Sequence, residues 1–228
     1  MRLWAVLAGA RLDPEPRLVL LSAVLPHLDS DRWLRWAIQA SADELALPLL
    51  DRIGRNLQGA DTAGLPMPGG GPAAGPAAKS TWSSQPSAEH LDLAQQLAAS
   101  LFSPDAAIEV RRLARLERRF RLSLPTQAEP GTDTGALRLW SAFLTGTAEG
   151  LARAGSSIRN LQEWLKPANP ATATALAADI DKLIAAAHSA SAPLWKRRFG
   201  LKIASATGAT LDLGTLLQAS NQATPAGG

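Results

Sequence analysis

Six arginines crowd an eleven-residue stretch near the middle of the chain, and their spacing makes it the strongest chemical feature of the sequence. They are Arg111, Arg112, Arg115, Arg118, Arg119 and Arg121. Apolar residues recur among them at helical spacing: Val110, Leu113, Leu116 and Phe120. The pattern predicts an amphipathic helix whose guanidinium groups offer planar forks to carboxylates or phosphates. Three interpretations remain open: a solvated face partly paired with Glu109 and Glu117, a surface for an acidic protein or a nucleic acid, and a contact between subunits.

A second basic cluster lies towards the C-terminal end, at 195–203. Its cationic residues are Lys196, Arg197, Arg198 and Lys202. Trp195, Phe199 and Ile203 share one helical face at i, i+4 and i+8. Such a helix is able to lie on an anionic membrane or to stack aromatic rings on single-stranded nucleic acid. Burial of the aromatic face is the favoured interpretation, because few aromatic residues are present to build a core.

Enzymatic chemistry finds little support in the sequence. The glycines at 69–71 are followed by no Lys-Ser or Lys-Thr pair and so do not form a phosphate loop, and no serine lies in a nucleophile elbow. The absence of cysteine removes thiolate nucleophiles and cysteine zinc sites. His27, His90 and His188 are far apart, and none has a second ligand at metal-binding spacing on its own helix. We therefore expect a protein that is not an enzyme and that uses neither a metal nor a cofactor.

The composition predicts an all-α fold. Hydrophobic residues make up 46% of the 228 residues and are mostly Ala and Leu, whereas Tyr is absent and Phe occurs four times. Ala and Leu lose little side-chain entropy in a helix, while the β-branched and aromatic residues that favour strands are scarce. The net charge of +3 is modest for a dedicated nucleic-acid binder.

The chain divides by composition into four parts. We expect an N-terminal helical segment at 1–58, a Pro/Gly/Ser-rich linker at 59–86, a C-terminal helical bundle at 87–220 and a loose tail at 221–228. Whether the two helical segments pack together is left open by the sequence.

Local signals place several helix boundaries. Ser87 and Asn169 are predicted N-caps, and Ser41 with Glu44 forms a predicted capping box. Pro48 is expected to kink or shorten its helix. The glycines at 146, 150 and 155 are expected to break the long helical pattern of 137–165 into two.

The N-terminal apolar run at 3–10 is too short for a typical signal peptide, so we expect a first helix that buries Leu3 and Trp4. No apolar run approaches the roughly 20 residues that span a bilayer. Together with the lack of cysteine, these features favour a cytoplasmic protein.

These observations favour a non-enzymatic interaction or accessory subunit of a larger bacterial assembly. Its expected partners are other protein subunits, bound through apolar helix faces and the Arg-rich helix. The alternative is a helical nucleic-acid-binding subunit that uses the basic clusters at 111–121 and 196–202. A membrane surface is the weakest of the three candidate partners, and no small-molecule substrate is evident.

Overall fold

A computed structural model describes residues 2–57, 86–102, 135–167 and 169–209. Every regular element in these ranges is a helix, which confirms the all-α prediction. The α-helices are α1 (Arg2–Gly9), α2 (Pro14–Val24), α3 (Arg32–Ala42), α4 (Ala46–Leu57), α5 (Ala88–Ser100), α7 (Gly135–Arg153), α8 (Ile158–Leu165), α9 (Pro170–His188) and α10 (Leu194–Thr207). Two short 3-10 helices, η1 (Leu25–Ser30) and η2 (Asp43–Leu45), join α2 to α3 and α3 to α4.

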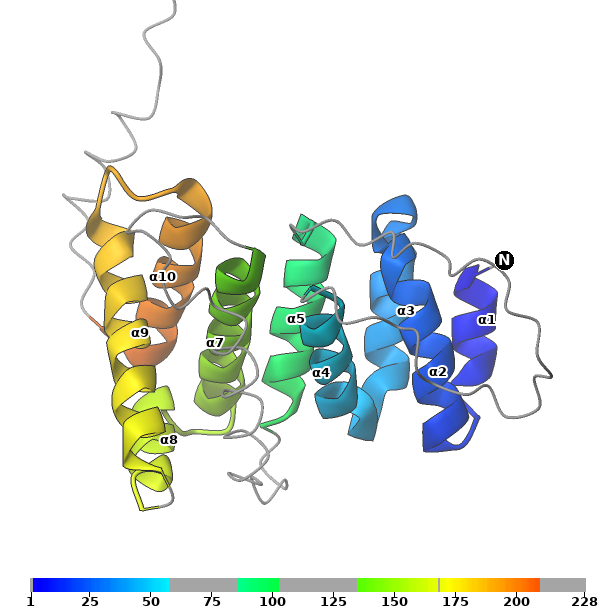
Figure 1. Ribbon diagram of the computed structural model, residues 1–228, viewed down its shortest axis with the longest axis horizontal. Helices are drawn as coiled ribbons and strands as arrows, with labels where there is room; N and C mark the ends of the chain where they lie inside the picture. Colours follow the sequence, from blue (N-terminus) through cyan, green and yellow to red (C-terminus); the bar gives the residue numbers. More distant parts are fainter. Residues whose placement is uncertain (1, 58–85, 103–134, 168, 210–228) are drawn as a thin grey trace, which may run out of the picture.

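The helices stand side by side along the long axis of the molecule, with α1 at one end and α9 at the other (Figure 1). Helix α1 packs against α2 and α3, and α3 and α4 pack against α5. Helix α5 also packs against α7, while α10 lies against both α7 and α9. The helices of the first segment are therefore in contact with α5, and one cluster of buried apolar side chains runs from Val6 in α1 to Ile203 in α10.

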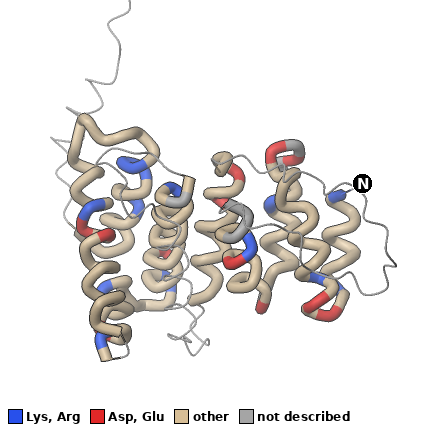
Figure 2. Tube along the Cα trace, viewed as in Figure 1, with Lys and Arg blue, Asp and Glu red and all other residues tan. Residues whose placement is uncertain are grey.

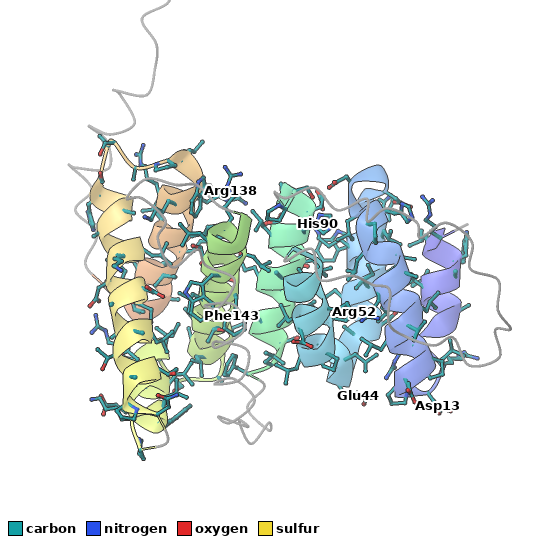
Figure 3. The ribbon with its side chains drawn as sticks, in the orientation of Figure 1. Asp13, Glu44, Arg52, His90, Arg138 and Phe143 are labelled. Atoms are coloured by element: carbon teal, nitrogen blue, oxygen red, sulfur yellow. The ribbon has the colours of Figure 1, made fainter. Side chains whose placement is uncertain are left out.

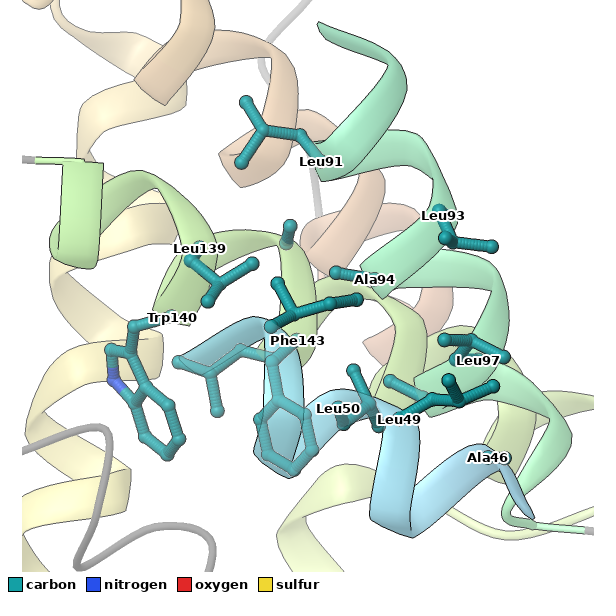
Figure 4. Close-up of a cluster of buried hydrophobic side chains, with 14 of the residues drawn as sticks. Ala46, Leu49, Leu50, Leu91, Leu93, Ala94, Leu97, Leu139, Trp140 and Phe143 are labelled. Carbon is teal, nitrogen blue, oxygen red and sulfur yellow. The ribbon is translucent and has the colours of Figure 1, made fainter. Parts of the chain in front are cut away.

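Much of this core is built where α4, α5 and α7 meet (Figure 4). The large fully buried side chains there are Leu49, Leu50, Leu93, Leu97, Leu139 and Trp140. Trp140 stacks on Phe143 with ring centroids 5.3 Å apart, and its Nε1 donates a hydrogen bond of 2.9 Å to Oδ2 of Asp179 in α9. The buried indole thus has both an apolar neighbour and an acceptor for its single donor.

Two of the predicted N-caps are confirmed. The Ser87 hydroxyl accepts from the backbone N–H of His90, and the Asn169 side chain accepts from that of Thr172. The predicted capping box is wrong, because Ser41 lies inside α3 and is buried. The Glu44 carboxylate pairs instead with Arg17, a residue of α2.

Pro48 shortens rather than kinks its helix. The regular α-helix begins at Ala46, so Pro48 lies in the first turn, where a proline removes no intrahelical hydrogen bond. The predicted break in the long pattern is also confirmed: α7 ends at Arg153, and Gly155 takes a φ of 71° before α8 begins.

Gly146 and Gly150 do not break α7 but allow it to approach α5 closely. A Cβ atom added to Gly146 would lie 2.0 Å from the backbone oxygen of Gln95, and one added to Gly150 would lie 2.4 Å from that of Ala99. Side chains are excluded at both positions, since the obstructing atoms belong to a helix backbone. Small residues spaced four apart therefore set the distance between these two central helices.

Candidate docking surface

The six arginines at 111–121 lie outside the described residues, as do most of the predicted linker at 59–86 and the tail at 221–228. Their predicted roles stay predictions. The second basic cluster is described in full and belongs to α10.

The aromatic face of α10 points into the protein. Phe199 and Ile203 are buried, and Trp195 packs partly buried against the same core. Trp195 also meets Phe199 edge to face and lies under the Arg138 guanidinium, whose Cζ is 5.5 Å from its ring centroid. The core interpretation of this face is therefore confirmed.

The cations of α10 have different surroundings. Arg198 is exposed, whereas Lys196, Arg197 and Lys202 are partly buried. Lys202 Nζ donates to Gln95 Oε1 at 2.9 Å, and Gln95 Nε2 donates in turn to the Glu149 carboxylate at 2.8 Å. This chain of polar groups joins α10, α5 and α7.

An open cleft of about 630 Å³ lies beside that chain, between α7 and α10. Its lining combines Glu149, Arg153 and Lys202 with Ser205 and small apolar side chains. The Glu149 carboxylate and the Lys202 ammonium both form hydrogen bonds with Gln95. These two charged groups of the cleft therefore stabilise the packing of the helices.

Among the described residues, the most exposed tryptophans are at the opposite end of the molecule, on the adjacent helices α1 and α3. Trp4 is 72% exposed and Leu7 43%, on α1; Trp33 is 55% exposed and Trp36 54%, on α3. We call these four residues the tryptophan surface. Single exposed apolar residues are ordinary, but a group of large ones on neighbouring helices is typical of an interaction site.

The prediction that Trp4 is buried is wrong, and the helical geometry of α1 explains why. Helix α1 turns Val6 and Gly9 towards α2 and α3 and keeps Leu3 partly buried. Trp4 and Leu7, one turn apart, lie outside this buried face and are exposed.

Helix α3 is apolar on two faces. Leu34, Ala37 and Ile38 form the buried face, while Trp33 and Trp36, three residues apart, are turned outwards. One apolar face is enough to hold a surface helix on the core of the protein. The second apolar face is the signal in the sequence that would have identified this surface.

Ion pairs fix the position of α3. Arg35 Nη1 lies 2.9 Å from an Asp92 carboxylate oxygen and 3.0 Å from one of Glu89, both on α5. The guanidinium Cζ also lies 5.6 Å from the ring centroid of Trp36. Because the Arg35 side chain is only 16% exposed, the pair is better shielded from solvent than an ordinary surface salt bridge. Trp36 thus projects from a helix that is firmly held.

His90 anchors the start of α5 to η1. Its Nε2 donates to the backbone oxygen of Leu25 at 3.0 Å, and its Nδ1 lies 2.6 Å from the Ser87 hydroxyl (His90 is labelled in Figure 3). A carbonyl oxygen only accepts, so a neutral ring protonated at Nε2 leaves Nδ1 to accept from Ser87. Burial lowers the pKa of His90, and the nearby Asp29, the Leu25 carbonyl and Glu89 oppose that shift only in part.

Within the described residues, no three His, Cys, Asp or Glu side chains are grouped so as to hold a metal ion. The helices of the same ranges are all too short or too polar to cross a bilayer. Comparison with protein-family models, with curated proteins and with solved structures finds no match to this chain.

Proposed function

We propose that this protein is a non-enzymatic helical interaction subunit that binds a protein partner through its tryptophan surface. The observation that carries the proposal is the exposure of Trp4, Trp33 and Trp36 on two adjacent helices. Tryptophan combines a large apolar area with few rotatable bonds, and it is the residue type most enriched among those that dominate binding energy at interfaces.

The rest of the described fold suits a scaffold. The polar side chains at the centre of the protein join helices: His90 joins α5 to η1, Arg35 joins α3 to α5, and Gln95 joins α5 to α7 and α10. A rigid support of this kind presents an exposed surface with little entropy to lose on binding. We also place the protein in the cytoplasm, since a chain without cysteine suits a reducing compartment.

The aromatic face of α10 does not offer exposed rings on which the bases of a nucleic acid could stack, as the nucleic-acid alternative supposed. Phe199 and Ile203 are buried in the core, and Lys202 donates to Gln95. Single-stranded nucleic-acid binders use ring stacking and free cations, so this alternative depends on the arginines at 111–121 and on the exposed Arg198 of α10.

The test begins with the tagged full-length chain, purified from its native cells with and without nuclease. A partner that survives nuclease is identified, purified separately and titrated against three forms of the protein by calorimetry. These are the wild type, the double variant Trp4→Ala/Trp36→Ala and the control Trp164→Ala, whose tryptophan is 42% exposed on α8.

We expect the double variant to bind at least about tenfold more weakly, a loss of about 1.4 kcal/mol or more. The Trp164→Ala control should bind like the wild type. Equal affinity for all three forms would overturn the proposal, as would a complex that disappears with nuclease. Circular dichroism and thermal melting verify that each variant is folded.

A further inference from the structure

We infer that the outer face of α10 and the cleft beside it form a second docking site, which takes an acidic protein segment that also carries apolar side chains. This inference goes beyond the proposed function, because the site lies on α10 and α7 and not on the tryptophan surface. The exposure, the charge and the shape of the site each support this occupant.

The outer face of α10 is one continuous stripe. Residues at i, i+3, i+4, i+7 and i+11 lie on one side of a helix, and here they are Leu194, Arg197, Arg198, Leu201 and Ser205. Leu194 is 79% exposed, more than any other large hydrophobic residue that the structure describes. Arg198 and Ser205 are exposed, and the other two are partly exposed. The stripe is about 17 Å long, and the opposite side of the same helix is buried in the core.

The charge of the stripe is positive and is not neutralised by the neighbouring helices. The sequence has no acidic residue between Asp181 and Asp212, and Figure 2 shows only basic charges along α10. Within the described residues, neither Arg197 nor Arg198 forms an ion pair, and the buried Nε of Arg197 has no hydrogen-bond partner.

The acidic side chains of α9 are already paired with basic residues. Asp179 lies 3.9 Å from the Lys182 ammonium, and Asp181 lies 3.8 Å from the Arg159 guanidinium. Two unpaired guanidinium groups one residue apart therefore remain on the stripe. Their planar forks match carboxylates, so an acidic partner complements this face.

The cleft at the C-terminal end of the stripe adds a partly apolar hollow. Leu201 belongs to both the stripe and the cleft, whose volume of about 630 Å³ is also bounded by Ala152 and Ala206. Glu149 is the acid of its lining, and both of its carboxylate oxygens accept from Gln95. An apolar side chain of the partner fits this hollow, and residues one turn further along then lie beside the two arginines.

Other occupants match this site less well. Single-stranded nucleic acid uses exposed rings for stacking, whereas α10 buries Phe199 and exposes leucine. An anionic bilayer would contact Leu194 but has no projecting group to fill the cleft. A second copy of the chain would bring arginines to face arginines. An acidic segment with apolar side chains satisfies both the stripe and the cleft.

Three synthetic peptides test the inference on the full-length chain. The first has about fourteen residues, enough to cover the stripe as a helix, with leucine at i, i+4, i+7 and i+11 and Glu at the flanking positions. The second replaces every Glu by Gln, and the third replaces every Leu by Ala. Calorimetry at low and high salt measures their affinities.

Two variants change the site, and a third is the control. Arg197→Glu/Arg198→Glu reverses the charge of the stripe, and Ser205→Trp fills the cleft without changing the charge. Arg159→Glu/Lys166→Glu makes the same change in net charge at exposed positions of α8 and its C-cap. Circular dichroism verifies that each variant is folded, and Arg198→Glu alone replaces the double variant if that one is not.

We expect the Glu/Leu peptide to bind at least about tenfold more tightly than either of the other peptides at low salt. Its advantage over the Gln/Leu peptide should shrink as salt rises, because screening weakens the contacts with the arginines. Both site variants should weaken its binding at least about tenfold. The control variant and Trp4→Ala/Trp36→Ala should bind it like the wild type.

No binding of the Glu/Leu peptide, or equal affinity for the Gln/Leu peptide, would overturn the inference. So would an affinity that the reversal of Arg197 and Arg198 leaves unchanged. An oligothymidine strand, or vesicles of phosphatidylcholine and phosphatidylserine, is titrated in parallel. Tighter binding of either than of the Glu/Leu peptide, lost in the same variant, would assign the face to phosphates and overturn the protein partner.

Discussion

His90 Nε2 donates a hydrogen bond of 3.0 Å to the backbone oxygen of Leu25, a residue 65 positions earlier in the chain. This contact joins the first turn of α5 to η1, and therefore joins the two helical segments that the composition separates. A neutral imidazole protonated at Nε2 suits both partners, with Nδ1 accepting from the Ser87 hydroxyl, and burial favours this neutral form.

The stability of the protein should consequently fall when the pH falls below about 6.5, the ordinary pKa of histidine. Burial lowers the pKa of His90 in the folded state, so the unfolded chain takes up the proton first. The contribution of His90 is then complete above about pH 6.5 and is lost as the pH falls from there towards the folded-state pKa. Urea unfolding between pH 5 and 8 measures this slope.

His90→Gln should flatten that slope, since the amide has no charge to gain. His188→Gln on α9 is the control, and it should keep the slope because His90 is intact. His90→Ala should cost about 1–3 kcal/mol at pH 8, since it leaves the buried Leu25 oxygen without this donor. An identical pH dependence in His90→Gln and wild type would contradict the assignment of the neutral imidazole.

The packing of α5 on α7 should depend on Gly146. Gly146→Ala places a methyl group 2.0 Å from the Gln95 backbone oxygen, and overpacking of this kind typically costs about 1–3 kcal/mol. Gly155 is the matched control, because a Cβ there meets nothing within 4 Å and its cost comes from the φ of 71° alone. Gly155→Asn should recover much of the loss seen in Gly155→Ala, because Asn tolerates this backbone conformation. A Gly146→Ala protein as stable as the wild type would show that the helices are farther apart than described.

The indole of Trp140 should contribute more to the free energy of unfolding than the burial of its apolar area alone. Its Nε1 donates to the Asp179 carboxylate at 2.9 Å, and the ring is 1% exposed. Trp140→Phe keeps most of the apolar packing but removes the donor, with an expected cost of about 2–4 kcal/mol from the lost hydrogen bond and the lost volume. Asp179→Asn should cost less, because the amide oxygen still accepts. Denaturant titration compares the two variants, and an equal or larger loss in Asp179→Asn would argue against this hydrogen bond.

Features that depend on neighbouring residues could be predicted from the sequence. Ser87 and Asn169 cap the helices that immediately follow them, and an Ala/Leu-rich composition favours helix in the residues that the structure describes. Gly155 could be recognised as one of three places for a break, because a positive φ is a local property.

Features that depend on residues distant in the sequence could not be predicted from it. Gly146 reads as a helix breaker until α5 is known to lie against it. Glu44 matches a capping box, yet Arg17 from another helix takes its carboxylate. Trp4 is predicted to be a core residue because tryptophan is highly buried on average. Only the packing of α1 on α2 and α3 decides which face of α1 is buried.

Fluorine NMR on protein labelled with 5-fluorotryptophan tests the proposed docking surface most directly. Each of the seven tryptophans gives one resonance, assigned by Trp→Phe substitution. On addition of the purified natural partner, we expect the resonances of Trp4 and Trp36 to shift or broaden, while those of the buried Trp140 and of Trp164 on α8 stay unchanged. A complex that moves the Trp164 resonance and leaves those of Trp4 and Trp36 in place would contradict the account.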